Sequence, residues 1–269
     1  MSKKVKWGLL ACAAFLLLIV GLGLANQLQS DRTSHVILTQ RRPLILIPGS
    51  DSSPHDFDNL VKQLNAQSQH PVVRLTITAD HTIRFSETRT KDSPLNETLV
   101  VIHYENSTDT NATIVDQTQG LAKAMMDLKK RLKMRDANAL GYSNGGLILS
   151  RYLAGMTTSQ PVTVKNVMLV GTPFLGTSTK HPDRELFNPL LAKKAQFKSL
   201  HAVVNVAGDT GHGNDDVVPV SSVAAGKQLF MNQADRYTQM TVNQAGITHA
   251  KLIQERYVAR LVRQNLLNQ

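Results

Sequence analysis

The feature that most constrains the fold is a short apolar segment that runs through a serine between glycines into a helix-forming stretch. Residues 138–142 are predicted to form a strand, and Gly141-Tyr142-Ser143-Asn144-Gly145 matches the pattern G-x-S-x-G. A helix is predicted over residues 147–153. A sharp turn between strand and helix requires glycine at positions 141 and 145, because larger side chains would meet neighbouring backbone. The same turn strains the backbone of Ser143 and lifts its hydroxyl above the edge of a sheet.

The rest of the chain alternates between two kinds of apolar pattern. Short continuous apolar runs are typical of strands buried on both faces of a parallel sheet, and they alternate with segments of helical periodicity. This alternation predicts an α/β fold, in which a central and mostly parallel sheet is flanked by helices. Strands are predicted at residues 44–47, 72–78, 81–88, 99–103, 138–142, 167–170, 202–207 and 237–242, and the longer helices at 116–134, 147–153 and 249–266. Residues 105–115 are predicted to be a polar, turn-rich loop, and residues 176–199 an irregular segment that could cover the site.

The N-terminus has a different character from the rest of the chain. Three lysines, at positions 3, 4 and 6, precede an uncharged apolar run of 19 residues from Trp7 to Ala25. At about 1.5 Å per residue, a helix of this length just spans a hydrocarbon core of about 30 Å. We therefore predict a signal peptide or membrane anchor at residues 1–26, a linker at 27–42, and one folded domain at 43–269. The lysines should stay in the cytoplasm, which places the domain outside the membrane.

The chain carries a formal net charge of +10. Its basic residues are scattered and no nucleic-acid-binding module is visible, so a nucleic-acid partner is not predicted. The charge favours attraction to anionic polymers of a cell envelope instead. The single cysteine, Cys12, lies in the apolar leader, so the predicted domain can form no disulfide and use no thiol catalysis.

The loop after the first predicted strand has the composition of an anion-stabilising turn. Pro48-Gly49-Ser50 directly follows residues 44–47, and glycine lets the backbone approach a bound group closely. The backbone N–H groups of Ser50 and Asn144 are therefore predicted to form an oxyanion hole beside Ser143.

A serine nucleophile needs a histidine base and an acid, which follow it in this order in the chain. His249 is the predicted base, because it follows the last predicted strand and opens the last helix; His181, His201 and His212 lie in less suitable places. The acid should follow the strand at 202–207, where Asp209, Asp215 and Asp216 are all candidates, and spacing alone does not choose among them. The same aspartates with His212 fit no standard calcium loop, so no metal or cofactor is predicted.

Together these segments resemble a known family. Gly141-Tyr142-Ser143-Asn144-Gly145-Gly146, Gly171-Thr172-Pro173-Phe174, Asn214-Asp215-Asp216-Val217-Val218-Pro219 and His249-Ala250-Lys251-Leu252 are similar to segments of the cell-surface α/β-hydrolases of Gram-positive bacteria. That family has long been grouped as a domain of unknown function and is distantly related to lipases and esterases. The resemblance covers about residues 43–266 and implies the α/β-hydrolase fold. It also implies that Asp215 is the acid and that Asp216 stands where the family usually has glycine.

The function expected from these features is that of a serine hydrolase outside the cytoplasmic membrane. Ser143, Asp215 and His249 would cleave a carboxylic ester, from a small molecule or a lipid-like substrate, through an acyl-enzyme. Two alternatives remain open from the sequence. One is acyl transfer to an acceptor in the cell envelope by the same residues. The other is a membrane-tethered binding protein that keeps the fold without the activity.

Overall fold

The computed structural model describes residues 42–66, 68–88, 97–244 and 246–267. Its centre is an eight-stranded sheet with the strand order β3-β2-β4-β1-β5-β6-β7-β8. Neighbouring strands are parallel except for β2 and β3, which pair antiparallel at one edge. The strands are β1 (Leu44–Ile47), β2 (Val72–Ile77), β3 (Ile83–Thr88), β4 (Leu99–Tyr104), β5 (Asp136–Tyr142), β6 (Thr163–Val170), β7 (Ala202–Asp209) and β8 (Arg236–Asn243). The predicted mostly parallel sheet is confirmed.

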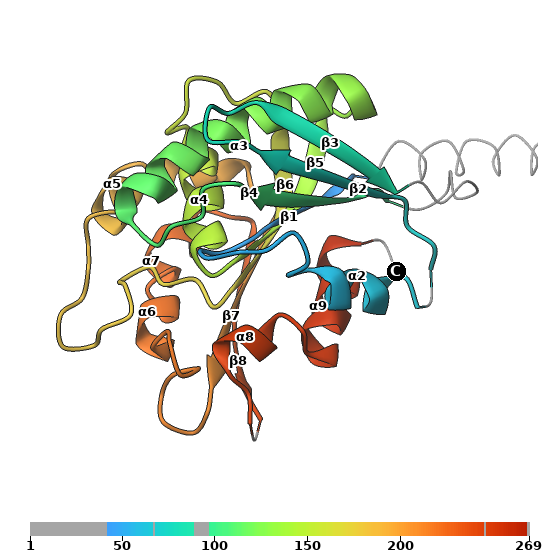
Figure 1. Ribbon diagram of the computed structural model, residues 1–269. Coiled ribbons are helices and arrows are strands. Elements are labelled where there is room, and N and C mark those ends of the chain that lie inside the picture. Colours follow the sequence, from blue (N-terminus) through green and yellow to red (C-terminus); the bar gives the residue numbers. More distant parts are fainter. Residues whose placement is uncertain (1–41, 67, 89–96, 245, 268–269) are drawn as a thin grey trace, which may run out of the picture. The chain divides into compact units, whose positions relative to one another are not determined.

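Helices cover both faces of the sheet (Figure 1). They are α2 (Asp58–Leu64), α3 (Asn111–Leu132), α4 (Asn144–Leu153), α5 (Phe187–Ala192), α6 (Val220–Ala224), α7 (Lys227–Phe230), α8 (His249–Leu252) and α9 (Arg256–Leu266), with a 3₁₀ helix, η1, at Lys194–Ser199. Helices α3 and α4 lie on one face, and α2 and α9 on the other.

The buried strand β1 shows why its sequence is continuously apolar. Ile45 and Ile47 belong to the core beneath α3 and α4, whereas Leu44 and Leu46 belong to the core beneath α2 and α9. All four side chains are 0% exposed, because successive residues of a strand point to opposite faces and both faces are covered.

The strand order places β1 in the middle of the sheet, between β4 and β5. Ile47, at the end of β1, is the partner of Gly141 near the end of β5. The loops that leave these two strands therefore start side by side at the carboxyl edge. In open α/β sheets, ligands bind at this edge where the strand order reverses.

Two helix predictions need correction. Helix α3 begins at Asn111 rather than near 116, because Thr110 caps it by accepting a hydrogen bond from the Thr113 N–H, so part of the predicted loop is helical. The predicted helix 249–266 is two helices, α8 and α9, separated at residues 253–255. The carbonyl of Gln254 in this break accepts a hydrogen bond of 2.7 Å from Gln63 Nε2 in α2.

The predicted membrane segment at 1–26 lies outside the described residues, as do Cys12 and all of the predicted linker at 27–42 except Arg42. Among the helices that are described, none is both long and apolar enough to cross a membrane.

The packing of α3 makes a stability prediction. Leu128 lies on the buried face of this helix and is 0% exposed. Leu128→Ala should therefore lower the free energy of unfolding by about 2–5 kcal/mol, because it leaves a cavity in the core. The neighbouring Lys129 is exposed, and Lys129→Ala should change the same quantity by no more than about 0.5 kcal/mol. Urea unfolding of both variants measures the difference, and equal effects would contradict the placement of α3.

Candidate active site

Ser143 occupies the turn between β5 and α4 with a strained backbone. Its φ of 53° and ψ of −130° lie in a region that residues with a side chain rarely adopt, as the sequence predicted. A Cβ atom added to Gly145 would overlap the carbonyl oxygens of Ile47 and Pro48. One added to Gly141 would lie 2.6 Å from the Cα of Gly146. Both glycines are thus required by close backbone contacts.

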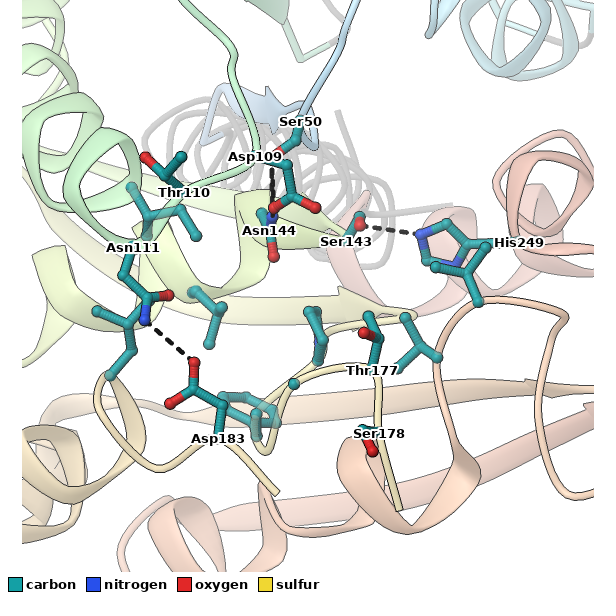
Figure 2. A pocket seen from close by; sticks show the side chains of 18 of the residues that line it. Ser50, Asp109, Thr110, Asn111, Ser143, Asn144, Thr177, Ser178, Asp183 and His249 are labelled. Atoms are coloured by element: carbon teal, nitrogen blue, oxygen red, sulfur yellow. Dashed lines mark hydrogen bonds between the residues drawn. The ribbon is translucent and has the colours of Figure 1, made fainter. Parts of the chain in front are cut away.

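A line of hydrogen bonds joins Ser143, His249 and Asp215. The Oγ of Ser143 lies 2.9 Å from His249 Nε2 (Figure 2), and His249 Nδ1 lies 2.7 Å from Asp215 Oδ2. An ionised carboxylate only accepts hydrogen bonds, so Nδ1 carries the proton and Nε2 is free to accept from the serine hydroxyl. The structure therefore brings together the three side chains that the sequence singled out.

Asp215 is fully buried, and its remaining oxygen is satisfied by backbone. Asp215 Oδ1 accepts hydrogen bonds from the N–H groups of Val218 and Val217, at 2.7 and 3.2 Å. The N–H of His249 also donates to the Asp215 carbonyl, at 2.6 Å. A buried charge without such partners would be costly, so these bonds hold the carboxylate in place against the imidazole.

The two other candidate aspartates, Asp209 and Asp216, have different surroundings. Asp216 is exposed and has a φ of 75°, the left-handed conformation that glycine adopts without strain. This backbone conformation explains why glycine suits the position. The side chain of Asp216 lies at the surface and not in the line of hydrogen bonds that joins Ser143, His249 and Asp215. Asp209 accepts hydrogen bonds from the N–H groups of Gly211 and Gly213, which hold the pKa of its carboxyl below the ordinary value.

Tyr142 supports the imidazole from one side. Its ring stacks on that of His249 with centroids 5.2 Å apart, and its hydroxyl donates to the His249 carbonyl at 2.9 Å. Burial raises the pKa of the Tyr142 phenol, so the hydroxyl stays protonated as a donor. The position before the nucleophile therefore orients the histidine as well as shaping the turn.

Ser50 and Asn144 both line a cavity of about 640 Å³ that opens above Ser143. Asn144 is the first residue of α4, and N–H groups in the first turn of a helix have no carbonyl partner within it. The side chains of the two residues also meet, since Asn144 Nδ2 donates to Ser50 Oγ at 2.7 Å. The structure thus places the side chains of these two residues next to each other at the cavity wall.

The cavity also contains residues that the sequence analysis missed. The loop before α3 and its first turn contribute Asp109, Thr110, Asn111 and Ile114, and Asp183 lies across from them, 3.0 Å from Asn111 Nδ2. Residues 105–115 carry no apolar periodicity and no known motif, so only the three-dimensional fold reveals this wall.

Part of the segment 176–199 lines the cavity. Gly176, Thr177, Ser178, His181, Asp183 and Leu186 line the cavity. Of the apolar residues Leu186, Phe187, Leu190 and Leu191, only Leu186 lines the cavity, and Phe187 and Leu190 are fully buried in the core.

Two of the other candidate histidines lie apart from Ser143, whereas His181 lines the cavity. His201 pairs with Asp235 at the opposite end of the sheet, where β8 begins, and His212 is exposed in the loop after β7. Within the described part of the chain, no group of three or more histidine, cysteine, aspartate or glutamate side chains is placed to hold a metal ion.

The sheet order and the strained turn before α4 define the α/β-hydrolase fold. The chain belongs to the family of alpha/beta hydrolases of unknown function (DUF915), which it matches over residues 32–269. The resemblance found in the sequence is thereby confirmed.

Solved structures agree with this assignment. A protein of Lactobacillus plantarum WCFS1, described as a proposed cell-surface hydrolase, is 31% identical with a TM-score of 0.73, over 84% of this chain and 91% of that one. A gene product of Listeria innocua is 21% identical with a TM-score of 0.74, over 83% and 93%. A lipase-esterase related protein of Clostridium acetobutylicum is 11% identical with a TM-score of 0.51, over 84% and 95%. The last two likenesses establish the fold alone. No curated protein matches the chain.

The bond between His249 and Asp215 can be tested without an assay of activity. The proton on His249 Nδ1 should give a downfield resonance in the ¹H NMR spectrum, because it is shared with a buried carboxylate at 2.7 Å. Asp215→Asn should remove this resonance, whereas Asp216→Asn should leave it unchanged. Loss of the signal in Asp216→Asn, or its survival in Asp215→Asn, would contradict the arrangement.

Proposed function

We propose that this protein is a serine hydrolase that cleaves carboxylic esters, with Ser143 as nucleophile, His249 as base and Asp215 as the supporting acid. The observation that carries the proposal is the continuous line of hydrogen bonds, 2.9 Å from Ser143 to His249 and 2.7 Å from His249 to Asp215. This geometry suits transfer of the serine proton to the imidazole, with the carboxylate stabilising the imidazolium that forms.

The reaction would proceed through an acyl-enzyme. Ser143 Oγ forms a bond to the acyl carbon while its proton passes to His249 Nε2. The imidazolium then gives this proton to the leaving oxygen, and the alcohol departs. Water next attacks the acyl carbon and gives a proton to His249, after which the Ser143 ester bond breaks, the proton returns to Oγ and the acid is released.

In each tetrahedral intermediate, the N–H groups of Ser50 and Asn144 would hold the oxyanion. Support comes from the position of Asn144 at the start of α4 and of Ser50 in the loop that follows β1, the strand that pairs with β5. Loss of one such donor typically costs about 3–4 kcal/mol of transition-state stabilisation.

We place this activity outside the cytoplasmic membrane. The lysines and the apolar run at residues 3–25, which lie outside the described residues, have the pattern of a signal peptide or membrane anchor. The Lactobacillus plantarum relative is described as a proposed cell-surface protein. A small-molecule or lipid-like ester of the envelope is the substrate class proposed, and the net charge of +10 would favour contact with anionic envelope polymers.

The test of the proposal is turnover of short-chain nitrophenyl esters. Ser143→Ala should abolish turnover and labelling by a fluorophosphonate, because it removes the attacking oxygen, and its unfolding curve should stay close to wild type. Ser199→Ala is a matched control, since Ser199 is exposed just before β7, at the end of the sheet away from the site. Turnover by Ser143→Ala at the wild-type rate would overturn the proposal.

The charge of the cavity predicts which esters are preferred. Among the residues that the structure describes, three carboxylates, Asp51, Asp109 and Asp183, line the cavity, and no lysine or arginine does. At the dielectric constant of water, each carboxylate about 8–10 Å from a substrate anion would cost on the order of 0.5 kcal/mol at low salt, which is about 1.4 kcal/mol for the three together. A nitrophenyl ester with a terminal carboxylate should therefore have a kcat/KM about tenfold lower than a neutral ester of equal length.

Added salt should narrow this difference, because it screens exposed charges. Asp183→Asn should narrow the difference as well, because removing this negative charge should raise kcat/KM for the anionic ester more than for the neutral one. Equal kcat/KM values for the two esters at low salt would contradict the assignment of cavity charge.

A further inference from the structure

The loop between β4 and α3 lies against the loop that follows β1. The carbonyl of Ser107 accepts a hydrogen bond of 2.7 Å from the Asp51 N–H, and Ser107 Oγ accepts one of 3.1 Å from the Ser52 N–H. Asp51 has a φ of 50°, which is unfavourable for a residue with a side chain. The bond from its own N–H helps to hold this conformation directly after Ser50.

Asp109 continues these contacts into the site (Figure 2). The side-chain amide of Asn144 donates one hydrogen to Asp109 Oδ1 at 2.6 Å and the other to Ser50 Oγ at 2.7 Å. Ser50 Oγ itself lies 3.4 Å from the same carboxylate oxygen. The three residues form a closed triangle, and two of them are the residues whose backbone N–H groups form the proposed oxyanion hole.

The carboxylate decides which way this amide faces. An ionised carboxylate only accepts hydrogen bonds, so the nitrogen of Asn144 and not its oxygen must point towards Asp109. With the nitrogen so placed, its second hydrogen reaches Ser50. Asn144 is only 7% exposed, so water offers its amide little competition as a partner. Asp109 therefore sets the link between the helix start and the loop after β1.

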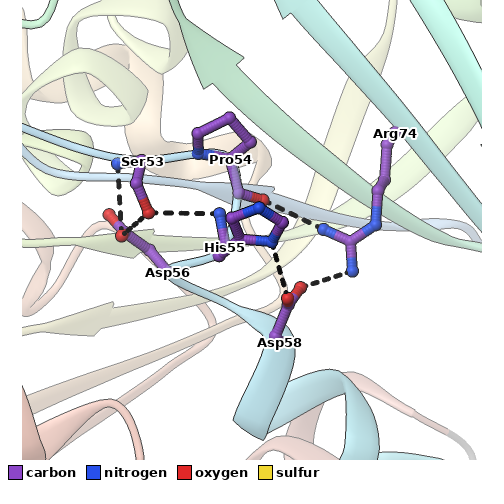
Figure 3. Close-up of polar contacts among 6 residues, drawn as sticks. All are labelled: Ser53, Pro54, His55, Asp56, Asp58 and Arg74. Carbon is purple, nitrogen blue, oxygen red and sulfur yellow. Dashed lines mark hydrogen bonds and ion pairs between the residues drawn. The ribbon is translucent and has the colours of Figure 1, made fainter.

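The other end of the loop that follows β1 is held by a separate set of contacts (Figure 3). Arg74 on β2 donates to the carbonyl of Pro54 at 3.0 Å and to Asp58 Oδ1 at 2.6 Å. Asp58 also lies 2.9 Å from His55 Nδ1. This end is thus anchored on a strand and on α2, whereas the contacts of Asp109 act on the end of the loop that carries Ser50.

We propose that Asp109 is a positioning residue for the oxyanion hole. Through Asn144 Nδ2 it ties the Ser50 loop to the first turn of α4, so that both N–H groups face the same point above Ser143. This inference rests on the proposed ester hydrolysis. Asp109 touches no reacting atom and acts through the oxyanion hole, which stabilises the transition state. Its substitution should therefore lower kcat more than it changes KM.

The experiment compares Asp109→Ala with Asp109→Asn on a neutral nitrophenyl ester. Alanine removes the acceptor, whereas the amide oxygen of asparagine can still accept from Asn144 Nδ2. We expect kcat to fall about tenfold in Asp109→Ala, less than the 100- to 1,000-fold typical when a donor is removed outright, with KM within about twofold. Asp109→Asn should recover kcat to within about threefold of wild type.

Asp235→Ala is the matched control, because this exposed aspartate pairs with His201 at the opposite end of the sheet. It should leave kcat unchanged. A second readout is amide hydrogen exchange over residues 48–55, which should become faster in Asp109→Ala and stay as in wild type in Asp235→Ala. This readout needs no substrate.

The outcomes separate the two proposals. Wild-type kcat and wild-type exchange in Asp109→Ala would overturn the positioning role, as would an equal loss of kcat in the asparagine and alanine variants. If wild-type protein hydrolyses no ester, the proposed function fails, while faster exchange in Asp109→Ala still supports the tie between the two loops and unchanged exchange refutes it.

Discussion

The parallel pairing of β1 with β5 is the constraint on which the site depends. Because Ile47 is the partner of Gly141, the loop carrying Ser50 and the turn carrying Ser143 leave the sheet as neighbours. No local interaction in either loop could bring them together across more than 90 residues of chain. The loss of chain entropy on closing that separation is offset by the burial of apolar side chains from these strands, which fill the cores on both faces of the sheet.

The strain at Ser143 persists because its surroundings leave the chain no alternative. The Ser143 N–H donates to the Val170 carbonyl at 2.8 Å, and its own carbonyl accepts from the Gly146 N–H at 2.9 Å. Both bonds connect the turn to buried elements, β6 on one side and α4 on the other. A strained conformation of this kind costs on the order of 1–3 kcal/mol and survives only where packing fixes it. In return the hydroxyl stands clear of the sheet, within reach of His249.

Sequence patterns predicted elements well where one physical rule governed them. The strand β1 was predicted to the residue, since four apolar residues end at Pro48-Gly49. The start of α3 was missed because its first two turns bury Thr113, Gln117 and Thr118 beside Ile114, and no apolar stripe marks such a face. The short helices α6 and α7 were not predicted, because helices of five and four residues show no measurable periodicity.

The candidate site likewise contains residues that a sequence rule could predict and residues that it could not. Ser143 and His249 could be predicted because each follows a strand at the carboxyl edge, where position in the fold and position in the sequence coincide. Spacing could not choose among Asp209, Asp215 and Asp216. In the structure Asp215 is buried against His249, whereas Asp216 is exposed with a left-handed backbone. Asp109 had no signal at all, because its partner Asn144 lies 35 residues away and nothing in a single sequence links two polar side chains that meet only after the sheet has formed.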